Sequence, residues 1–152
     1  MRIRDYLRDD RMIFDLKARN KKEAIKKISV LLKKADEMID FDVFLKDVFE
    51  REELKTTGIG KEVAIPHART DAVKDFVMVF AKSPEGVKFN SLDGKPVKLI
   101  FLIGTPKKEK LNNHLKILAR LTKLLQEKSF RDSLLNASSS KEIIEKFREV
   151  ES

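Results

Sequence analysis

The sequence contains no cysteine and no tryptophan, and only two of its 152 residues are histidines. The lack of cysteine excludes disulfides, cysteine-ligated zinc, iron–sulfur clusters and a thiol nucleophile, and it is typical of a cytoplasmic protein. Two histidines argue against a dedicated transition-metal site, so we expect neither a metal nor another cofactor. No stretch approaches the roughly 18 apolar residues that a membrane span needs, so we also expect no membrane insertion.

Residues 1–10 mix both charge signs and have no apolar stretch, which argues against a secretory signal and again favours a cytoplasmic location. A hydrophobic content of 41% over this length is enough to build a core. There is no low-complexity linker and no internal repeat. We therefore expect residues 1–152 to form a single domain.

The chain is basic, with 33 lysines and arginines against 25 acidic residues and a formal net charge of +8. Such a balance can indicate a nucleic-acid partner. In residues 1–55, however, the signs alternate as they do on solvated helices with ion pairs. The basic residues between 107 and 131 have almost no aromatic neighbours that could stack on bases. We therefore expect no nucleic-acid partner.

Helices are predicted from capping residues that precede apolar stripes. Asn20 is the first such cap and Asp40 the second, and we expect a loop to open at residues 51–53. A long helix with leucines on one face is predicted over 111–125. A last helix begins after Ser139.

Strands are predicted at Val63–Ile65, Phe76–Ala81 and Val97–Ile103, with a turn at Asp93-Gly94 before the last of them. Their near-continuous apolar runs indicate a sheet covered on both faces. Alternation of helices and strands with short connections predicts an α/β fold.

His67 directly follows the strand Val63–Ile65 and Pro66, which fixes φ and lacks a backbone donor. Gly58 and Gly60 give the backbone freedom before that strand. The imidazole would thus be held rigidly at the carboxyl end of a strand, where ligands and reacting groups collect in α/β proteins. A buried histidine that is hydrogen-bonded in a turn is the alternative interpretation.

The second histidine, His114, is spaced so that it lies on or beside the apolar face of the long predicted helix. A core histidine is the simplest interpretation of this position. A functional role requires His114 and His67 to meet in the fold.

A set of motifs resembles one known family along nearly the whole chain. The segments Thr56-Thr57-Gly58-Ile59-Gly60 and Val63-Ala64-Ile65-Pro66-His67-Ala68 resemble the active-site motif of the fructose/mannitol-class IIA domains of the bacterial phosphoenolpyruvate-dependent sugar phosphotransferase system (PTS). Further similar segments follow the family's order: Asp15-Leu16-Lys17-Ala18, Arg51-Glu52, Ser91-Leu92-Asp93-Gly94 and His114-Leu115-Lys116-Ile117-Leu118-Ala119-Arg120-Leu121.

The resemblance implies a three-layer α/β/α domain with a mixed central β-sheet flanked by helices. It also implies that His67 accepts a phosphoryl group from phospho-HPr, as a tele-phosphohistidine, and passes it to a cysteine of a IIB component. His114 and Arg51 match the accompanying histidine and arginine of the family's active site.

The chemistry of these residues suits such roles. A neutral imidazole is a nucleophile near pH 7, and the guanidinium of Arg51 can bridge two phosphoryl oxygens. Loop amides around Thr57, Gly58 and Gly60 are further candidate donors to the phosphoryl group.

Arg69 is another candidate for phosphate binding because it stands two residues after His67. A solvent-facing charge is its alternative interpretation. Whether Arg69 or Lys61 contacts the phosphoryl group stays open.

Two functional classes share this chemistry. We first interpret the chain as a transport component that acts on separate HPr and IIB partners in the uptake of a fructose/mannitol-class sugar. The alternative is a nitrogen-regulatory IIA-like protein, in which the phosphorylation state of His67 controls binding to target proteins. The sequence identifies neither the sugar nor the oligomeric state.

Overall fold

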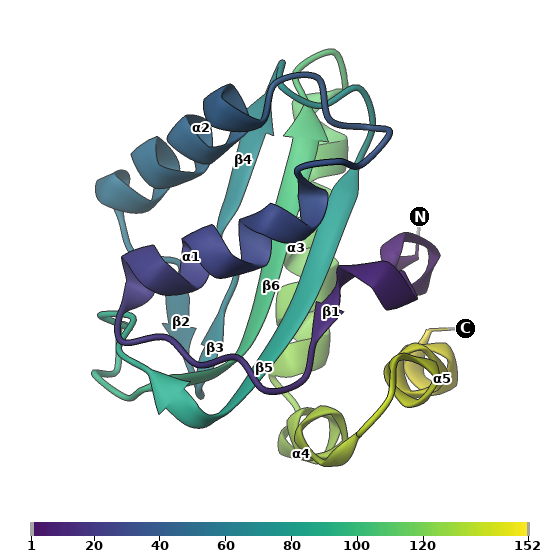
Figure 1. The fold of residues 1–152 in the computed structure, drawn as a ribbon. Helices are drawn as coiled ribbons and strands as arrows, with labels where there is room; N and C mark the ends of the chain where they lie inside the picture. Colours follow the sequence, from purple (N-terminus) through teal and green to yellow (C-terminus); the bar gives the residue numbers. More distant parts are fainter. Residues whose placement is uncertain (1, 152) are drawn as a thin grey trace.

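The computed structural model describes residues 2–151 as a sheet between two layers of helices (Figure 1). The strands are β1 (Met12–Ile13), β2 (Gly58–Gly60), β3 (Val63–Ala64), β4 (His67–Thr70), β5 (Val77–Val87) and β6 (Val97–Pro106). The helices are α1 (Lys21–Ser29), α2 (Phe41–Leu54), α3 (Leu111–Leu125), α4 (Lys128–Asn136) and α5 (Ser140–Val150). Short 3-10 helices span Ile3–Tyr6, Asp9–Arg11 and Val30–Leu32.

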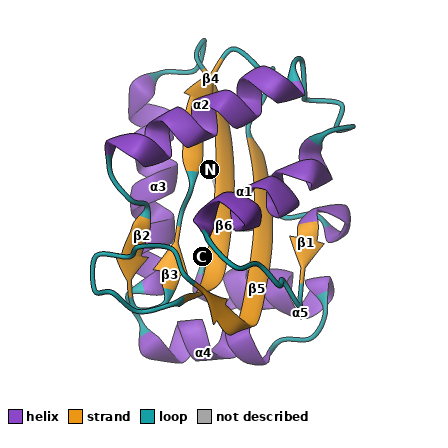
Figure 2. Cartoon of the chain, turned by 60° about the vertical axis from the view of Figure 1, so that its left-hand side comes forward, coloured by secondary structure: helices purple, strands orange, loops and turns teal. Residues whose placement is uncertain are grey.

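The sheet is mixed, with strand order β1-β5-β6-β3-β2, and β4 pairs with β6 beyond the end of β3. β3 and β4 both run parallel to β6, so together they resemble one strand interrupted at Ile65 and Pro66 (Figure 2). β5 runs antiparallel to β6, and β1 pairs with β5 in parallel. This interruption places His67 at the start of β4.

Alternating residues of the central strands pack into two separate hydrophobic cores, one on each face of the sheet. Val79 of β5 packs in the cluster beneath α1 and α2, whereas its neighbour Phe80 packs in the cluster beneath α3, α4 and α5. Both side chains are fully buried. Because strand side chains point alternately to the two faces, one sheet supports both helical layers. The predicted three-layer α/β/α class with a mixed sheet is confirmed.

The predicted helix starts are also confirmed by their caps. The side chains of Asn20, Asp40 and Ser139 accept hydrogen bonds from the amides of Glu23, Val43 and Glu142, at 2.9, 3.2 and 3.2 Å. Each bond satisfies one of the amides that a helix start leaves without a backbone partner.

The prediction of a loop at residues 51–53 was wrong, because these residues belong to the last turn of α2. Arginine and glutamate are good helix formers, and neither glycine nor proline occurs before Gly58. The helix ends where Lys55 adopts an extended backbone, with φ −169° and ψ 138°.

Other boundaries differ from the predicted ones. β5 continues past Ala81 to Val87, with an irregular register against β6 after Lys82. β3 ends at Ala64, one residue earlier than predicted, and β1, β2, β4 and α4 were not predicted. Within residues 2–151, no helix combines the length and apolar character that crossing a membrane demands.

Candidate functional site

A cleft of about 720 Å³ opens between β4 and the helices α2 and α3, and both histidines line it. We call it the His67 cleft. It is lined by Asp47, Glu50, Arg51, Leu54, His67, Ala68, Arg69, Lys107, Leu111, His114, Leu115 and Leu118. Three chain segments that are distant in sequence thus build one site.

His67 is held by the main chain at the interruption between β3 and β4. Its Nδ1 lies 2.8 Å from the carbonyl oxygen of Ile65. Since a carbonyl only accepts, Nδ1 carries the proton and donates, which leaves the lone pair on Nε2. Burial lowers the pKa of His67 below its usual value, and the charge of Arg51 acts in the same direction, while the bond to Ile65 opposes them.

His114 projects from α3 to the same place. The ring centroids of His67 and His114 lie 5.4 Å apart, so the structure brings the two histidines together as expected. His114 is buried, and its Nδ1 lies 2.7 Å from the hydroxyl oxygen of Thr105 on β6. Burial, followed by the charges of His67, Arg69 and Arg51, lowers the pKa of His114 to about 4. The ring is therefore neutral near pH 7.

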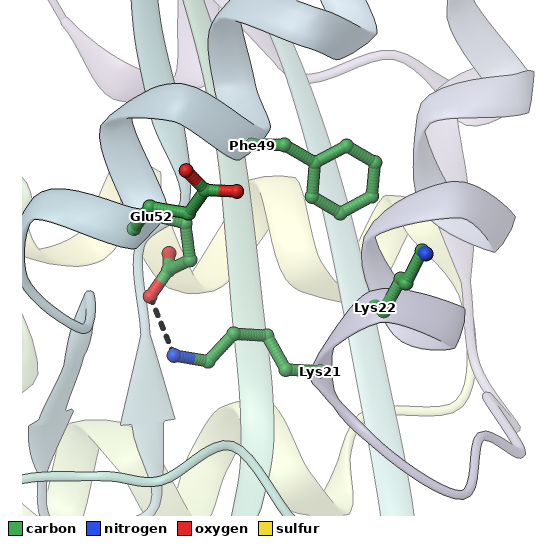
Figure 3. A pocket seen from close by; sticks show the side chains of 5 residues that line it. Lys21, Lys22, Phe49 and Glu52 are labelled. Carbon is green, nitrogen blue, oxygen red and sulfur yellow. Dashed lines mark ion pairs between the residues drawn. The ribbon is translucent and has the colours of Figure 1, made fainter.

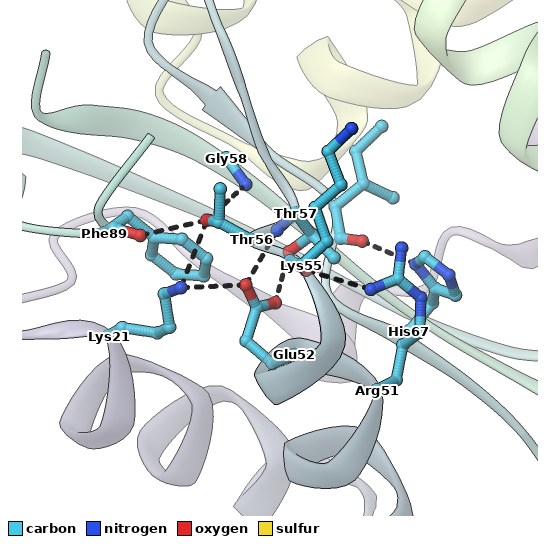
Figure 4. A network of polar contacts seen from close by, with 10 residues as sticks. Lys21, Arg51, Glu52, Lys55, Thr56, Thr57, Gly58, His67 and Phe89 are labelled. Atoms are coloured by element: carbon cyan, nitrogen blue, oxygen red, sulfur yellow. Dashed lines mark hydrogen bonds and ion pairs between the residues drawn. The ribbon is translucent and has the colours of Figure 1, made fainter. Parts of the chain in front are cut away.

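Arg51 reaches the cleft from the last turn of α2. Its Nη1 donates a hydrogen bond of 2.9 Å to the carbonyl oxygen of Lys55, which orients the guanidinium on the side of His67 (Figure 4). The influence of Arg51 on the pKa of both histidines reflects this common location. A half-buried guanidinium here suits the binding of an oxyanion.

Arg69 lies on the same face of β4 as His67, because strand side chains alternate. Its Nη2 donates to the carbonyl oxygens of Lys107 and Glu109, at 3.0 and 2.8 Å. Arg69 thereby links the strand of His67 to the turn that precedes α3. Its Nε is buried and has no hydrogen-bond partner among the described residues.

Thr57, Gly58 and Gly60 lie between α2 and β3, and they do not line the His67 cleft within the described residues. The amide of Thr57 donates to Glu52 at 2.7 Å, and that of Gly58 donates to the Thr56 hydroxyl at 3.1 Å. Both amides are therefore occupied. The phosphate-binding role suggested for these three residues stays a prediction.

Lys61 follows β2 at the other end of the sheet. Its Nζ donates to the side chain of Gln126, just after α3, at 2.8 Å. It does not line the His67 cleft. Of the two residues left open by the sequence, the structure thus brings Arg69 rather than Lys61 to the histidines.

Sequence reasoning missed several residues that build the site. Asp47 of α2 accepts a 2.6 Å hydrogen bond from the hydroxyl of Thr70, which ties α2 to β4. Thr105 orients His114, and the buried Glu52 binds the segment after α2. The apolar helical spacing around Asp47 gave no signal, since the contact depends on which strand lies beneath the helix.

A second hollow, of about 420 Å³, lies between α1 and α2 (Figure 3). Its lining includes Lys21, Lys22, Phe49, Glu52 and Glu53, and neither histidine. Among the described residues, no group of three or more metal-ligating side chains forms a metal site. The His67 cleft is therefore the candidate active site.

A family model described as "Phosphoenolpyruvate-dependent sugar phosphotransferase system, EIIA 2" matches residues 5–150. The chain belongs to this family. Among relatives of this EIIA family, the fructose-specific EIIA component of Haloferax volcanii is 38% identical over 130 residues, which are 86% of this chain and 84% of that protein. The fructose-specific EIIABC component of Bacillus subtilis is 34% identical over 95% of this chain, but the chain spans only 23% of that protein.

Solved structures of the EIIA family share the fold. The nitrogen regulatory protein IIA-Ntr from Neisseria meningitidis superposes with a TM-score of 0.88 at 32% identity, with 95% of this chain and 98% of that chain covered. The mannitol enzyme IIA of Escherichia coli, in its complex with phosphorylated mannitol enzyme IIB, gives a TM-score of 0.80 at 25% identity, with 94% and 97% covered.

Proposed function

We propose that this EIIA-family chain is a phosphoryl carrier, in which Nε2 of His67 accepts a phosphoryl group from phospho-HPr and donates it to a cysteine of a IIB component. The observation that carries this proposal is the hydrogen bond from Nδ1 of His67 to the Ile65 carbonyl. It assigns the proton to one ring nitrogen and the nucleophilic lone pair to the other.

Each step exchanges one bond to phosphorus for another. Nε2 of His67 bonds to phosphorus while the P–N bond of the donor's phosphohistidine breaks, and the donor imidazole leaves with that electron pair. In the second step a cysteine thiolate bonds to phosphorus and the P–Nε2 bond breaks. No external base is required, because the lowered pKa keeps His67 unprotonated near pH 7. The Ile65 carbonyl stabilises the positive charge that the ring gains when Nε2 bonds to phosphorus.

Positive charge and hydrogen-bond donors around His67 stabilise the transferred group. Phosphoryl transfer passes through a loose transition state with charge on the equatorial oxygens, so positioning and electrostatics provide most of the catalysis. Arg51 binds these oxygens through its guanidinium. His114 donates from Nε2 in the tautomer whose Nδ1 accepts a hydrogen bond from the hydroxyl of Thr105, 2.7 Å away.

Exposed leucines around the cleft support docking of the two partner proteins. Leu54, Leu111 and Leu115 are 82%, 52% and 51% exposed, and all three line the His67 cleft. Apolar surface of this kind, with charges at its rim, is typical of transient protein interfaces. A related mannitol enzyme IIA forms a complex with its phosphorylated IIB enzyme, which supports a IIB partner here.

The substrate pathway we propose is uptake of a fructose/mannitol-class sugar, which the fructose-specific relatives support. A regulatory role is the second candidate, and it is favoured by the similarity to a nitrogen regulatory IIA. In that role the phosphorylation state of His67 controls binding to target proteins. The site chemistry is the same in both cases.

The test is phosphoryl incorporation from phosphoenolpyruvate, enzyme I and HPr into His67→Ala and the parent. We expect the parent to be labelled and the variant to remain unlabelled, while His114→Ala is labelled slowly because its acceptor is intact. Full labelling of His67→Ala would overturn the assignment. Transfer of the phosphoryl group from the labelled protein to a fructose-type IIB domain supports the transport role. A phosphoryl group that stays on the protein in the presence of that domain supports the regulatory role.

A further inference from the structure

Two neighbouring residues at the end of α2 point in different directions. Arg51 lines the His67 cleft, whereas Glu52 is only 6% exposed and lies on the inner side of the helix. Successive helix residues are rotated by about 100°, so one side chain can reach the cleft while the next is buried. The position of Arg51 is thus tied to that of Glu52.

The carboxylate of Glu52 is held by two hydrogen bonds and one ion pair. Oε2 accepts a hydrogen bond of 2.7 Å from the amide of Thr57 and forms an ion pair with Nζ of Lys21 at 2.9 Å. Oε1 accepts from the hydroxyl of Thr57 at 2.5 Å. Figure 3 shows the Lys21–Glu52 pair from the hollow between α1 and α2. Charge-assisted hydrogen bonds of this kind are strong and geometrically specific.

Lys21 is itself fixed from two further sides. Its Nζ donates to the hydroxyl of Thr56 at 3.1 Å and lies 5.1 Å from the ring centroid of Phe89. The first residue of α1 is thereby joined to the end of α2 and to the segment that follows it.

This network reaches His67 and Arg51 through the main chain (Figure 4). The carbonyl of Thr57 accepts a 3.0 Å hydrogen bond from the amide of Ile65, whose own carbonyl accepts from Nδ1 of His67. The carbonyl that orients Arg51 belongs to Lys55, in the same short segment. Glu52 therefore fixes the segment 55–57. Main-chain groups of this segment hold Arg51 directly and His67 through Ile65.

We propose that Glu52, paired with Lys21, is a positioning residue for phosphoryl transfer: it fixes segment 55–57 so that Nε2 of His67 and the guanidinium of Arg51 face the same phosphoryl group. This inference rests on the carrier function proposed above. A buried ion pair contributes little net stability compared with apolar residues of the same volume, so its main contribution is the defined geometry.

The test uses phosphoramidate as a small phosphoryl donor, so that no partner protein enters the measurement. Its P–N bond breaks as Nε2 of His67 bonds to phosphorus, and ammonia leaves. The variants are Glu52→Gln and Lys21→Met, and Glu53→Gln is the matched control because Glu53 is an exposed neighbour on the same turn. Rates are measured for folded samples, and ³¹P NMR distinguishes Nδ1-phosphohistidine from Nε2-phosphohistidine.

We expect Glu53→Gln to react at the parent's rate and Glu52→Gln to react about ten- to a hundredfold more slowly, since small misplacements of reacting groups have effects of this size. Loosening the bond between His67 and Ile65 should also add Nδ1-phosphohistidine to the product. A loss of stability alone would not change which nitrogen reacts. If Glu52→Gln does not fold, Lys21→Met tests the proposal instead. We expect it, too, to react more slowly than the parent and to add Nδ1-phosphohistidine to the product.

Folded variants that react at the parent's rate and give only Nε2-phosphohistidine would overturn the positioning role and leave the carrier function intact. A parent protein that takes up no phosphoryl group at His67, from phosphoramidate or from phospho-HPr, would instead overturn the carrier function and the inference together.

Discussion

The rings of His67 and His114 lie 5.4 Å apart, centroid to centroid, and their planes are inclined by 55°. A proton on His67 disfavours a proton on His114, because the charge of His67 lowers the pKa of His114. At neutral pH both imidazoles are therefore neutral, and in the proposed function His67 is the nucleophile while His114 is a hydrogen-bond donor. This separates the roles of two residues of the same type.

Replacement of Arg51 by alanine is expected to cost about 2–4 kcal/mol of transition-state stabilisation, on the scale seen when one preorganised donor is removed. Transfer from phospho-HPr, followed in a rapid-quench assay, measures this loss. Arg148→Ala is the control, since Arg148 lies on α5 and is paired with Glu145. A rate within twofold of the parent's would show that Arg51 does not stabilise the transition state. The variant should also raise the pKa of His67, because the charge of Arg51 lowers it.

Stability should depend on pH through His114. Its pKa is about 4 in the folded protein against a usual value of 6.5, so between these values the unfolded chain binds more protons. The free energy of unfolding therefore decreases as the pH falls from 6.5 to 4, by at most about 3 kcal/mol from this residue. Urea denaturation of the parent and of His114→Gln at pH 7 and pH 4 measures the difference. An equal loss in both proteins would contradict the prediction.

Transfer from phospho-HPr to His67 is expected to be independent of divalent metal. Donor and acceptor are both imidazoles, and Arg51 supplies the positive charge that a metal would otherwise provide. Purified phospho-HPr should therefore transfer at the same rate with and without EDTA. A strict magnesium requirement at this step would contradict the prediction, because a metal ion and not Arg51 alone would then supply the positive charge.

Gly104→Ala should destabilise the fold next to the site. A Cβ at Gly104 would lie 2.7 Å from atoms of Phe44 and Val77, which are both buried. Overpacking of this kind typically costs about 1–3 kcal/mol. Gly94→Ala is the comparison, because no atom lies within 4 Å of its Cβ and only its φ of +73° opposes the change. Thermal melting of both variants checks the order, and equal melting temperatures would contradict it.

Much of the fold could be predicted because the signals are local. Asn20, Asp40 and Ser139 cap helices through residues three positions away, so a short window of sequence is sufficient. The end of α2 was predicted too early: Arg51 and Glu52 are good helix formers that continue the helix, and the stop comes from the extended backbone of Lys55. β2 was missed because two of its three residues are glycines, which give no strand signal.

The site was predictable where it depends on residue type and motif. His67, His114 and Arg51 line one cleft, as the resemblance implied. The partner of Nδ1 was not predictable, because the carbonyl of Ile65 is a main-chain atom that every residue type carries. Glu52 was missed for another reason: Lys21 precedes it by 31 positions, and only the packing of α1 against α2 brings them together.

The interruption between β3 and β4 has a consequence for how the protein tolerates mutation. The group that fixes which ring nitrogen of His67 carries the proton is the carbonyl oxygen of residue 65, so no side chain has to be kept for that purpose. The Ile65 side chain packs in the core beneath α3, and exchange for another apolar residue of similar volume would test packing alone. The protonation pattern of the His67 ring is thus set by the path of the backbone, and a change of side chain at residue 65 leaves the group that sets it in place.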